Sequence, residues 1–62
     1  MKDKEFKKGD IGWFFDTYVW QEREAIVVCV YNDHYACVSD NIRFSVPKNE
    51  LFKTKEELLL SL

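Results

Sequence analysis

The chain has 62 residues, of which 47% are hydrophobic, 16% are aromatic and 32% are charged. Nine Lys and Arg residues against eleven Asp and Glu residues give a net charge of -2, which argues against a chain built mainly to bind nucleic acid. No apolar run is long enough to cross a membrane, and no signal-peptide segment follows the charged start. These features favour one small cytoplasmic domain.

Such a short chain buries only about 60% of its unfolded surface, so large side chains are needed to stabilise it. Much of the aromatic content is therefore expected to form the core. Residues 1–8, with the sequence MKDKEFKK, are expected to be a flexible charged arm on a single domain that spans 1–62.

A first strand is predicted for the sequence IGWFF, residues 11–15, after a Gly-Asp turn. Because side chains alternate along a strand, Ile11, Trp13 and Phe15 share one side, which we expect to face the core. The opposite side carries Gly12 and Phe14. The next residues, DTYVWQER, are predicted to form a long hairpin loop.

A three-strand meander is predicted over residues 24–47. Asn32-Asp33 and Asp40-Asn41 each separate two β-rich runs, and both residue types tolerate the backbone of tight two-residue turns. That register places Val28 opposite Cys37. The face predicted to be the core carries Ile26, Val28, Val30, Tyr35, Cys37, Ile42, Phe44 and Val46. The other face carries Ala25, Val27, Cys29, Tyr31, Ala36, Val38, Arg43 and Ser45.

The C-terminal part is predicted to contain a short helix. Pro47 ends the meander, and residues 48–51 form a turn. Thr54 and Glu57 have the spacing of a capping box, which predicts a helix at about 55–61. A stripe of Leu58, Leu59 and Leu62 must then dock on the sheet. Either this helix or a second copy of the chain, in a homodimer, is expected to cover the second face of the sheet.

This order of elements resembles an SH3-like small barrel, mainly β, of four to five antiparallel strands. More narrowly, the opening FKKGDIGWF and the closing LFKTKEEL resemble short SH3-like barrel proteins of Firmicutes and of their phages and mobile elements. The matching residues are Gly9, Asp10, Leu51, Phe52, Thr54, Glu56 and Glu57. Gly12 departs from the branched residue expected at its position. The resemblance implies the fold and a mobile-element origin, and it brings no established activity.

Catalytic and metal chemistry find little support in the residues. Cys29, His34 and Cys37 span a strand, a turn and a strand, and the predicted register sends the two thiols to opposite faces. A Cys–His pair is the only simple arrangement for an activated nucleophile that these residues offer, but Cys37 is predicted to point inward. We therefore expect free thiols, no metal, no cofactor and no enzymatic activity.

A protein-binding module is the function that the sequence favours, acting as a phage or prophage accessory protein on a host protein, with host defence as one setting. Phe14, Tyr18, Trp20 and Tyr31 are the expected anchors, rimmed by Asp16, Glu22, Arg23 and Glu24. Alternatively, Trp20 folds back as a lid on the barrel. A second function, nucleic-acid binding, would combine the same aromatic residues with Lys7, Lys8 and Arg43.

Overall fold

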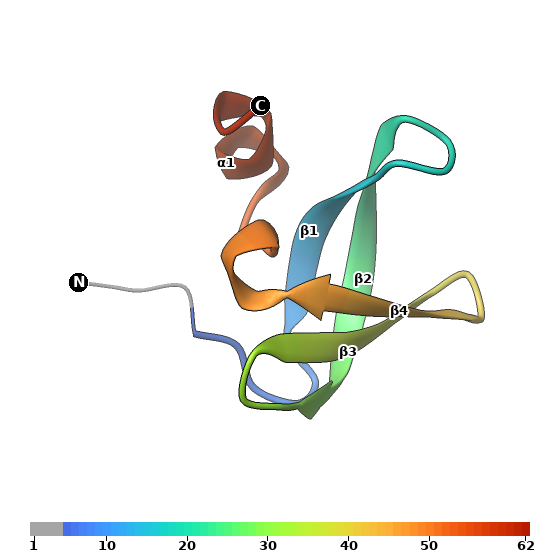
Figure 1. Ribbon diagram of the computed structural model, residues 1–62, viewed down its shortest axis with the longest axis vertical. Coiled ribbons are helices and arrows are strands. Elements are labelled where there is room, and N and C mark those ends of the chain that lie inside the picture. The colour runs from blue at the N-terminus through green and yellow to red at the C-terminus, as the bar shows by residue number, and fades with distance from the viewer. Residues whose placement is uncertain (1–4) are drawn as a thin grey trace.

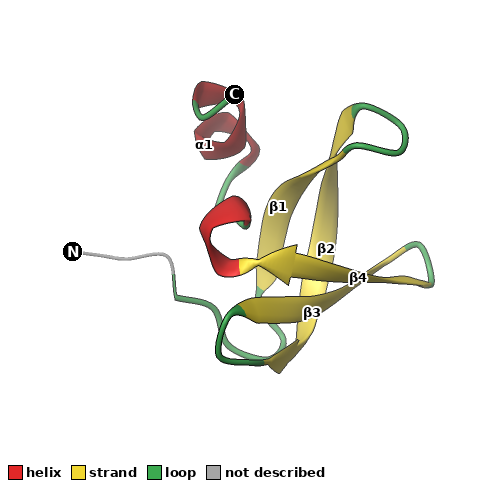
Figure 2. Cartoon of the chain, in the orientation of Figure 1, coloured by secondary structure: helices red, strands yellow, loops and turns green. Residues whose placement is uncertain are grey.

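Tight turns connect the strands of this small domain, for which a computed structural model describes residues 5–62. The elements are β1 (Ile11–Asp16), β2 (Gln21–Val30), β3 (His34–Ser39), β4 (Ile42–Pro47), the 3-10 turn η1 (Lys48–Glu50) and α1 (Lys55–Leu60). Neighbouring strands are antiparallel in the order β1-β2-β3-β4 (Figures 1 and 2). The predicted fold class, a small mainly β barrel-like sheet with a C-terminal helix, is confirmed.

The third hairpin has the two-residue turn that the sequence predicts. Asp40 and Asn41 have φ angles of 53° and 64°, the left-handed conformation that such a turn requires. Ser39 consequently lies opposite Ile42, and the predicted register of β3 with β4 is confirmed through Tyr35 opposite Val46. At the second turn, the N–H of Tyr31 donates a 3.0 Å hydrogen bond to the carbonyl oxygen of His34.

A β-bulge at Val28 corrects the predicted register of β2. The pairing shifts between Val27 and Cys29, so that Val27, instead of Val28, lies opposite Cys37. Ala25 and Val27 are therefore buried, whereas Ile26, predicted to be core, is 49% exposed. Two further predicted core residues, Val30 and Ile42, are exposed because they lie where their strands end.

The faces of β1 are the reverse of those predicted. Phe14 is only 6% exposed, and Gly12 and Asp16 are also buried, whereas Ile11 is exposed. Leu51 explains the reversal, because its Cγ would lie 2.7 Å from a Cβ placed on Gly12. The absence of a side chain at Gly12 admits a leucine into the core.

The sheet is strongly coiled, and the chain returns to its first strand. In Figure 1, β1 and β2 stand upright while β3 and β4 cross them. After η1, Phe52 pairs with the outer edge of β1 through two hydrogen bonds to Trp13, of 2.7 and 2.8 Å. The core inside this curve contains Phe6, Phe14, Ala25, Val27, Tyr35, Cys37, Val46 and Leu51.

Part of the predicted arm belongs to the core. Residues 1–4 lie outside the described residues, but Phe6 is 3% exposed and its ring packs edge-on against Tyr35, with centroids 5.3 Å apart. A flexible arm through residue 8 is therefore wrong at Phe6, because the arm contains an aromatic side chain that the small core accommodates.

Helix α1 begins as predicted and docks through one leucine. The Thr54 hydroxyl accepts a hydrogen bond from the N–H of Glu57, and the Glu57 carboxylate accepts one from the N–H of Lys53. Leu58 is buried, while Leu59 and Leu62 of the predicted stripe are exposed. No helix in the described part of the chain is long and apolar enough to cross a membrane.

Candidate functional site

The tip of the first hairpin presents two exposed aromatic side chains. The connection between β1 and β2 is only residues 17–20, shorter than the predicted loop because β2 begins at Gln21. Tyr18 is 93% exposed and Trp20 is 75% exposed. Trp20 touches the ring of Phe15 at a centroid distance of 5.6 Å and does not cover the core. These exposures do not fit the alternative in which Trp20 is a lid.

A hydrogen bond closes the start of the hairpin tip. Oδ1 of Asp16 accepts a 2.9 Å hydrogen bond from the N–H of Tyr18, which closes a local turn at the end of β1. Trp20 has a φ of 55°, so its backbone is in the left-handed region that suits glycine or asparagine. The hairpin thus places a tryptophan at a position where its backbone is strained.

Arg23 joins the first hairpin to the third. Its Nε lies 2.9 Å from Oδ2 of Asp16, which is buried, and its Nη1 lies 3.3 Å from Oδ2 of Asp40 in the tight turn. The guanidinium also lies 5.1 Å from the centroid of the Phe44 ring. In Figure 1 both hairpin tips lie on the same side of the molecule. The guanidinium therefore fixes the position of the aromatic tip relative to β4.

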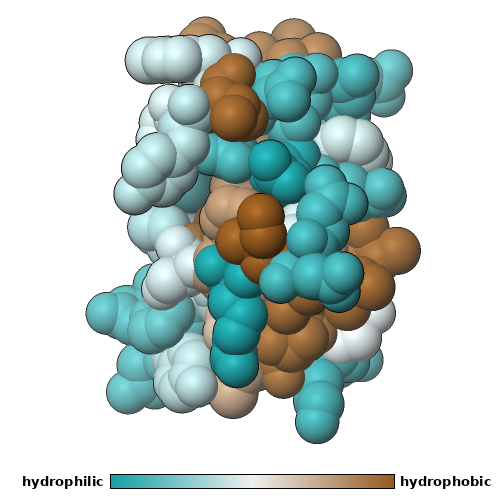
Figure 3. All heavy atoms as spheres, turned by 90° about the vertical axis from the view of Figure 1, so that its right-hand side faces the viewer, coloured by the Kyte–Doolittle hydropathy of each residue, from teal (hydrophilic) through white to brown (hydrophobic). Residues whose placement is uncertain are grey.

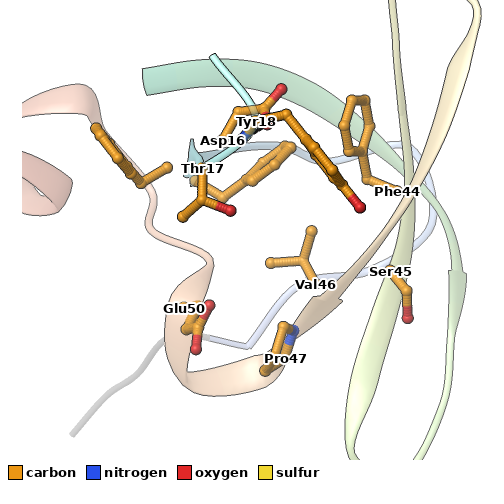
Figure 4. A pocket seen from close by; sticks show the side chains of 10 residues that line it. Asp16, Thr17, Tyr18, Phe44, Ser45, Val46, Pro47 and Glu50 are labelled. Atoms are coloured by element: carbon orange, nitrogen blue, oxygen red, sulfur yellow. Dashed lines mark hydrogen bonds between the residues drawn. The ribbon is translucent and has the colours of Figure 1, made fainter. Parts of the chain in front are cut away.

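A cleft of about 190 Å³ lies between the hairpin tip and β4. Figure 4 shows Asp16, Thr17 and Tyr18 on one side of the cleft, and Val46, Pro47 and Glu50 on the other. Phe14, Phe15, Phe44 and Ser45 complete the lining. Its aromatic and aliphatic side chains share the lining about equally with the polar groups of Asp16, Thr17, Ser45 and Glu50, and the cleft opens beside the exposed Tyr18.

No family model matches the chain, and searches of curated proteins and of solved structures find no match either. No similar protein therefore assigns a function to the hairpin tip or to the cleft.

The structure distributes the predicted anchors and rim residues over several places. Phe14 is a core residue, its ring 5.1 Å from that of Phe44, so its predicted exposure is wrong. Tyr31 lies at the other end of β2 from Trp20, and its ring stacks on His34 at 4.7 Å. It does not share a surface with the tip. Of the predicted anchors, Tyr18 and Trp20 alone lie together.

The predicted charged rim serves mainly to hold the sheet. Asp16 and Arg23 form the inward ion pair described above, and Glu22 lies 3.5 Å from Nζ of Lys55 in α1. Glu24 is exposed and lies opposite Trp13. Residue type alone cannot separate these ion-paired side chains from surface charges, which is why the sequence predicts them as a surface.

The basic residues of the nucleic-acid alternative do not converge. Lys7 and Lys8 are exposed just before β1, and Arg43 is exposed on β4, the strand at the other end of the sheet order. The N–H of Lys7 donates to the Asp10 carboxylate at 2.8 Å, so a negative charge accompanies this turn. These cations therefore do not form one basic stripe with the aromatic tip.

The cysteines and the histidine are separate groups. Both thiols are free, and burial raises the pKa of Cys37. His34 lies in the second turn, where its Nδ1 is 2.7 Å from the Asp33 carboxylate. Among residues 5–62, no three His, Cys, Asp or Glu side chains are placed to hold a metal ion. The thiol that is deeper in the protein is thus less able to act as a nucleophile.

A second apolar area lies on the outer face of the sheet. Hydrophobic side chains gather over the lower part of the face seen in Figure 3. Ile11 lies opposite Ile26, and Ile26 lies opposite Val38, around a shallow hollow. The bulge at Val28 turns Ile26 outward, and the sequence pattern gives no signal of that turn.

Proposed function

We propose that the protein is a non-enzymatic protein-binding module that uses Tyr18 and Trp20 as its anchors. Exposed tyrosine and tryptophan side chains with restricted backbones are typical of the residues that contribute most to protein–protein binding energy. The cleft beside Tyr18 offers a place for an apolar side chain of the partner. Asp16 and Arg23 position the tip and do not act as the contact rim.

The left-handed, exposed Trp20 is the observation that carries this proposal. A non-glycine residue in this backbone region costs about 1–2 kcal/mol, and Trp20 regains little of that through burial, because it is 75% exposed. Strain without compensating burial is a recurrent property of functional positions. A partner that buries the indole would provide the missing stabilisation.

The setting of this function is inferred from the sequence. The resemblance to short proteins of Firmicutes and of their phages supports a bacterial host protein as the partner, with the module acting as an accessory factor. Two free thiols in the chain fit the reducing environment of a cytoplasm.

Replacement of Trp20 by glycine tests the proposal. Trp20→Gly relieves about 1 kcal/mol of backbone strain and loses an aromatic contact of similar size with Phe15, so the free energy of unfolding should change by less than about 1 kcal/mol. The immobilised 62-residue chain should retain a specific protein from a Firmicutes lysate, and Trp20→Gly should lose it. Chemical denaturation and affinity capture with mass spectrometry measure the two effects.

Leu60→Ala is the matched control, because Leu60 is another exposed hydrophobic residue, at the far end of the chain in α1. It should leave capture unchanged. A large loss of stability in Trp20→Gly would instead assign the indole to the core. Binding of oligonucleotides that weakens steeply with salt, together with no protein capture, would overturn the proposal in favour of nucleic-acid binding.

A further inference from the structure

Strand β4 is the last strand of the sheet, and its outer edge runs along the cleft. Ser39 and Ile42 close a two-residue turn and therefore form a hydrogen-bonded pair. Because peptide groups alternate in direction along an antiparallel strand, those of Ile42, Phe44 and Val46 point toward β3. Those of Arg43 and Ser45 point to the outer edge.

Among residues 5–62, these outward peptide groups have no hydrogen-bond partner. In the part of the chain that the structure describes, the N–H and C=O groups of Arg43 and Ser45 form no backbone hydrogen bond outside the strand ladders. An unpaired edge of this kind is a template for another strand unless it is covered. Here a cleft lies beside it.

We propose that the outer edge of β4 accepts an extended segment of another protein as an additional antiparallel strand, with apolar side chains toward the cleft and an acidic side chain opposite Arg43. This inference deepens the proposed protein-binding function, on which it rests, by giving the partner's conformation. Alternating unpaired N–H and C=O groups are complementary to an extended backbone. Phe44 and Val46 line the cleft, whereas Arg43 is exposed and forms no ion pair with any other residue of the described range 5–62.

A second copy of the chain fits this edge less well than a different partner. Suppose that the β4 strands of two copies pair antiparallel about a two-fold axis. If Phe44 lies opposite Phe44 of the other copy, the two Arg43 side chains become diagonal neighbours on one face. If Arg43 lies opposite its counterpart, the two guanidinium groups face each other directly. In both arrangements the two Arg43 side chains repel each other, which disfavours pairing of the two copies. Pairing centred on Ser45 places Arg43 opposite Pro47, whose nitrogen cannot donate a hydrogen bond. Charge and hydrogen bonding therefore favour an acidic segment of another protein.

A peptide of alternating valine and glutamate, with blocked ends, is the probe. In the proposed arrangement the glutamates lie opposite Arg43 and Ser45 and turn their peptide groups toward β4. Added to the isotope-labelled full chain, the peptide should shift the amide resonances of Arg43 and Ser45, saturating with a Kd of about 1 mM or tighter.

Two methylated forms of the peptide provide the decisive comparison on the unmodified protein. N-methyl groups on the glutamates block the edge that faces β4, and N-methyl groups on the valines block only the opposite edge. The first form should bind at least about tenfold more weakly than the second, since it loses hydrogen bonds to the strand. Equal binding of the two forms would overturn strand addition.

Proline at Ser45 tests the same edge from the protein side. Its N–H points away from β3, so Ser45→Pro removes an outward donor and leaves the ladder intact. We expect binding to fall about tenfold or more, while Ser45→Ala should bind normally. If Ser45→Pro fails to fold, the methylated peptides still decide.

The remaining outcomes separate this inference from the proposed function. Leu60→Ala should still bind the peptide, because Leu60 lies in α1 and belongs neither to the β4 edge nor to the lining of the cleft. No peptide-induced shifts, with Trp20-dependent capture intact, would overturn strand addition alone. Shifts at Arg43 and Ser45 that appear on raising the protein concentration without peptide would identify a second copy as the occupant and overturn the proposal.

Discussion

Gly12 determines at the residue scale which way β1 faces. Leu51 is fully buried, and its Cγ, Cδ1 and Cδ2 atoms lie within 3.0 Å of the position that a Cβ on Gly12 would occupy. The branched side chain that sequence analysis leads one to expect at this position would displace Leu51. The glycine is thus required by a close approach between strand β1 and the returning chain.

Gly12→Ala should therefore destabilise the protein by about 1–3 kcal/mol, because a methyl group would overpack a filled site. Leu51→Ala alone should cost about 2–5 kcal/mol through the cavity that it leaves. The double variant should lose less than the sum of the two, since the added methyl group then occupies part of that cavity. Urea denaturation of the four proteins measures the coupling, and strict additivity would contradict the packing described.

The aromatic tip was partly predictable at the same scale. Tyr18 and Trp20 could be recognised from sequence because they interrupt the strand pattern near polar residues. Phe14 could not be separated from them, because alternation gives two faces and does not say which is buried. The roles of Asp16 and Arg23 depend on a contact between residues on different strands, which no local pattern records.

At the scale of elements, turns were easier to predict than strand registers. Asp40-Asn41 has the residue types that a left-handed two-residue turn requires, and the pairing of β3 with β4 followed from it. The bulge in β2 was missed because Val27 and Val28 are the same residue type, so hydrophobicity cannot decide which one faces the core. The length of the first loop was missed because Gln21, Glu22 and Arg23 are polar residues within a strand.

The second turn should show a characteristic pH dependence. The hydrogen bond from His34 is the main cause that lowers the pKa of Asp33 below its ordinary 3.8, with a smaller contribution from the Asp33 backbone N–H. Because the folded pKa is lower than the unfolded one, the turn gains stability above about pH 3.8, and this gain is lost as the pH falls through the folded pKa.

A carboxyl NMR titration of Asp33 should give a midpoint below 3.8 in the folded protein. His34→Phe removes the ring nitrogen while keeping an aromatic ring for Tyr31 to stack on, so the midpoint should return toward 3.8. A wild-type midpoint at or above 3.8 would show that the contact does not persist in solution.

For the whole molecule, residues from both ends of the described chain close the core. Phe52 pairs with Trp13 at the outer edge of β1. Lys53 reaches the N-terminal segment, where its Nζ lies 2.9 Å from the carbonyl oxygen of Glu5 and 4.2 Å from the centroid of the Phe6 ring. The barrel-like class was predictable from strand order, whereas this closure joins residues almost fifty positions apart and has no signature in local sequence.

Phe6 is the core residue that the N-terminal segment adds to this closure. At about 0.05–0.15 kcal/mol per residue, a chain of this length has a total stability of about 3–9 kcal/mol. Phe6→Ala should remove about 3–5 kcal/mol, so the variant should be partly unfolded at room temperature. Phe6→Leu keeps most of the buried volume and should lose much less. Thermal unfolding followed by circular dichroism compares the variants, and an unchanged melting temperature for Phe6→Ala would show that the N-terminal segment is a solvated arm after all.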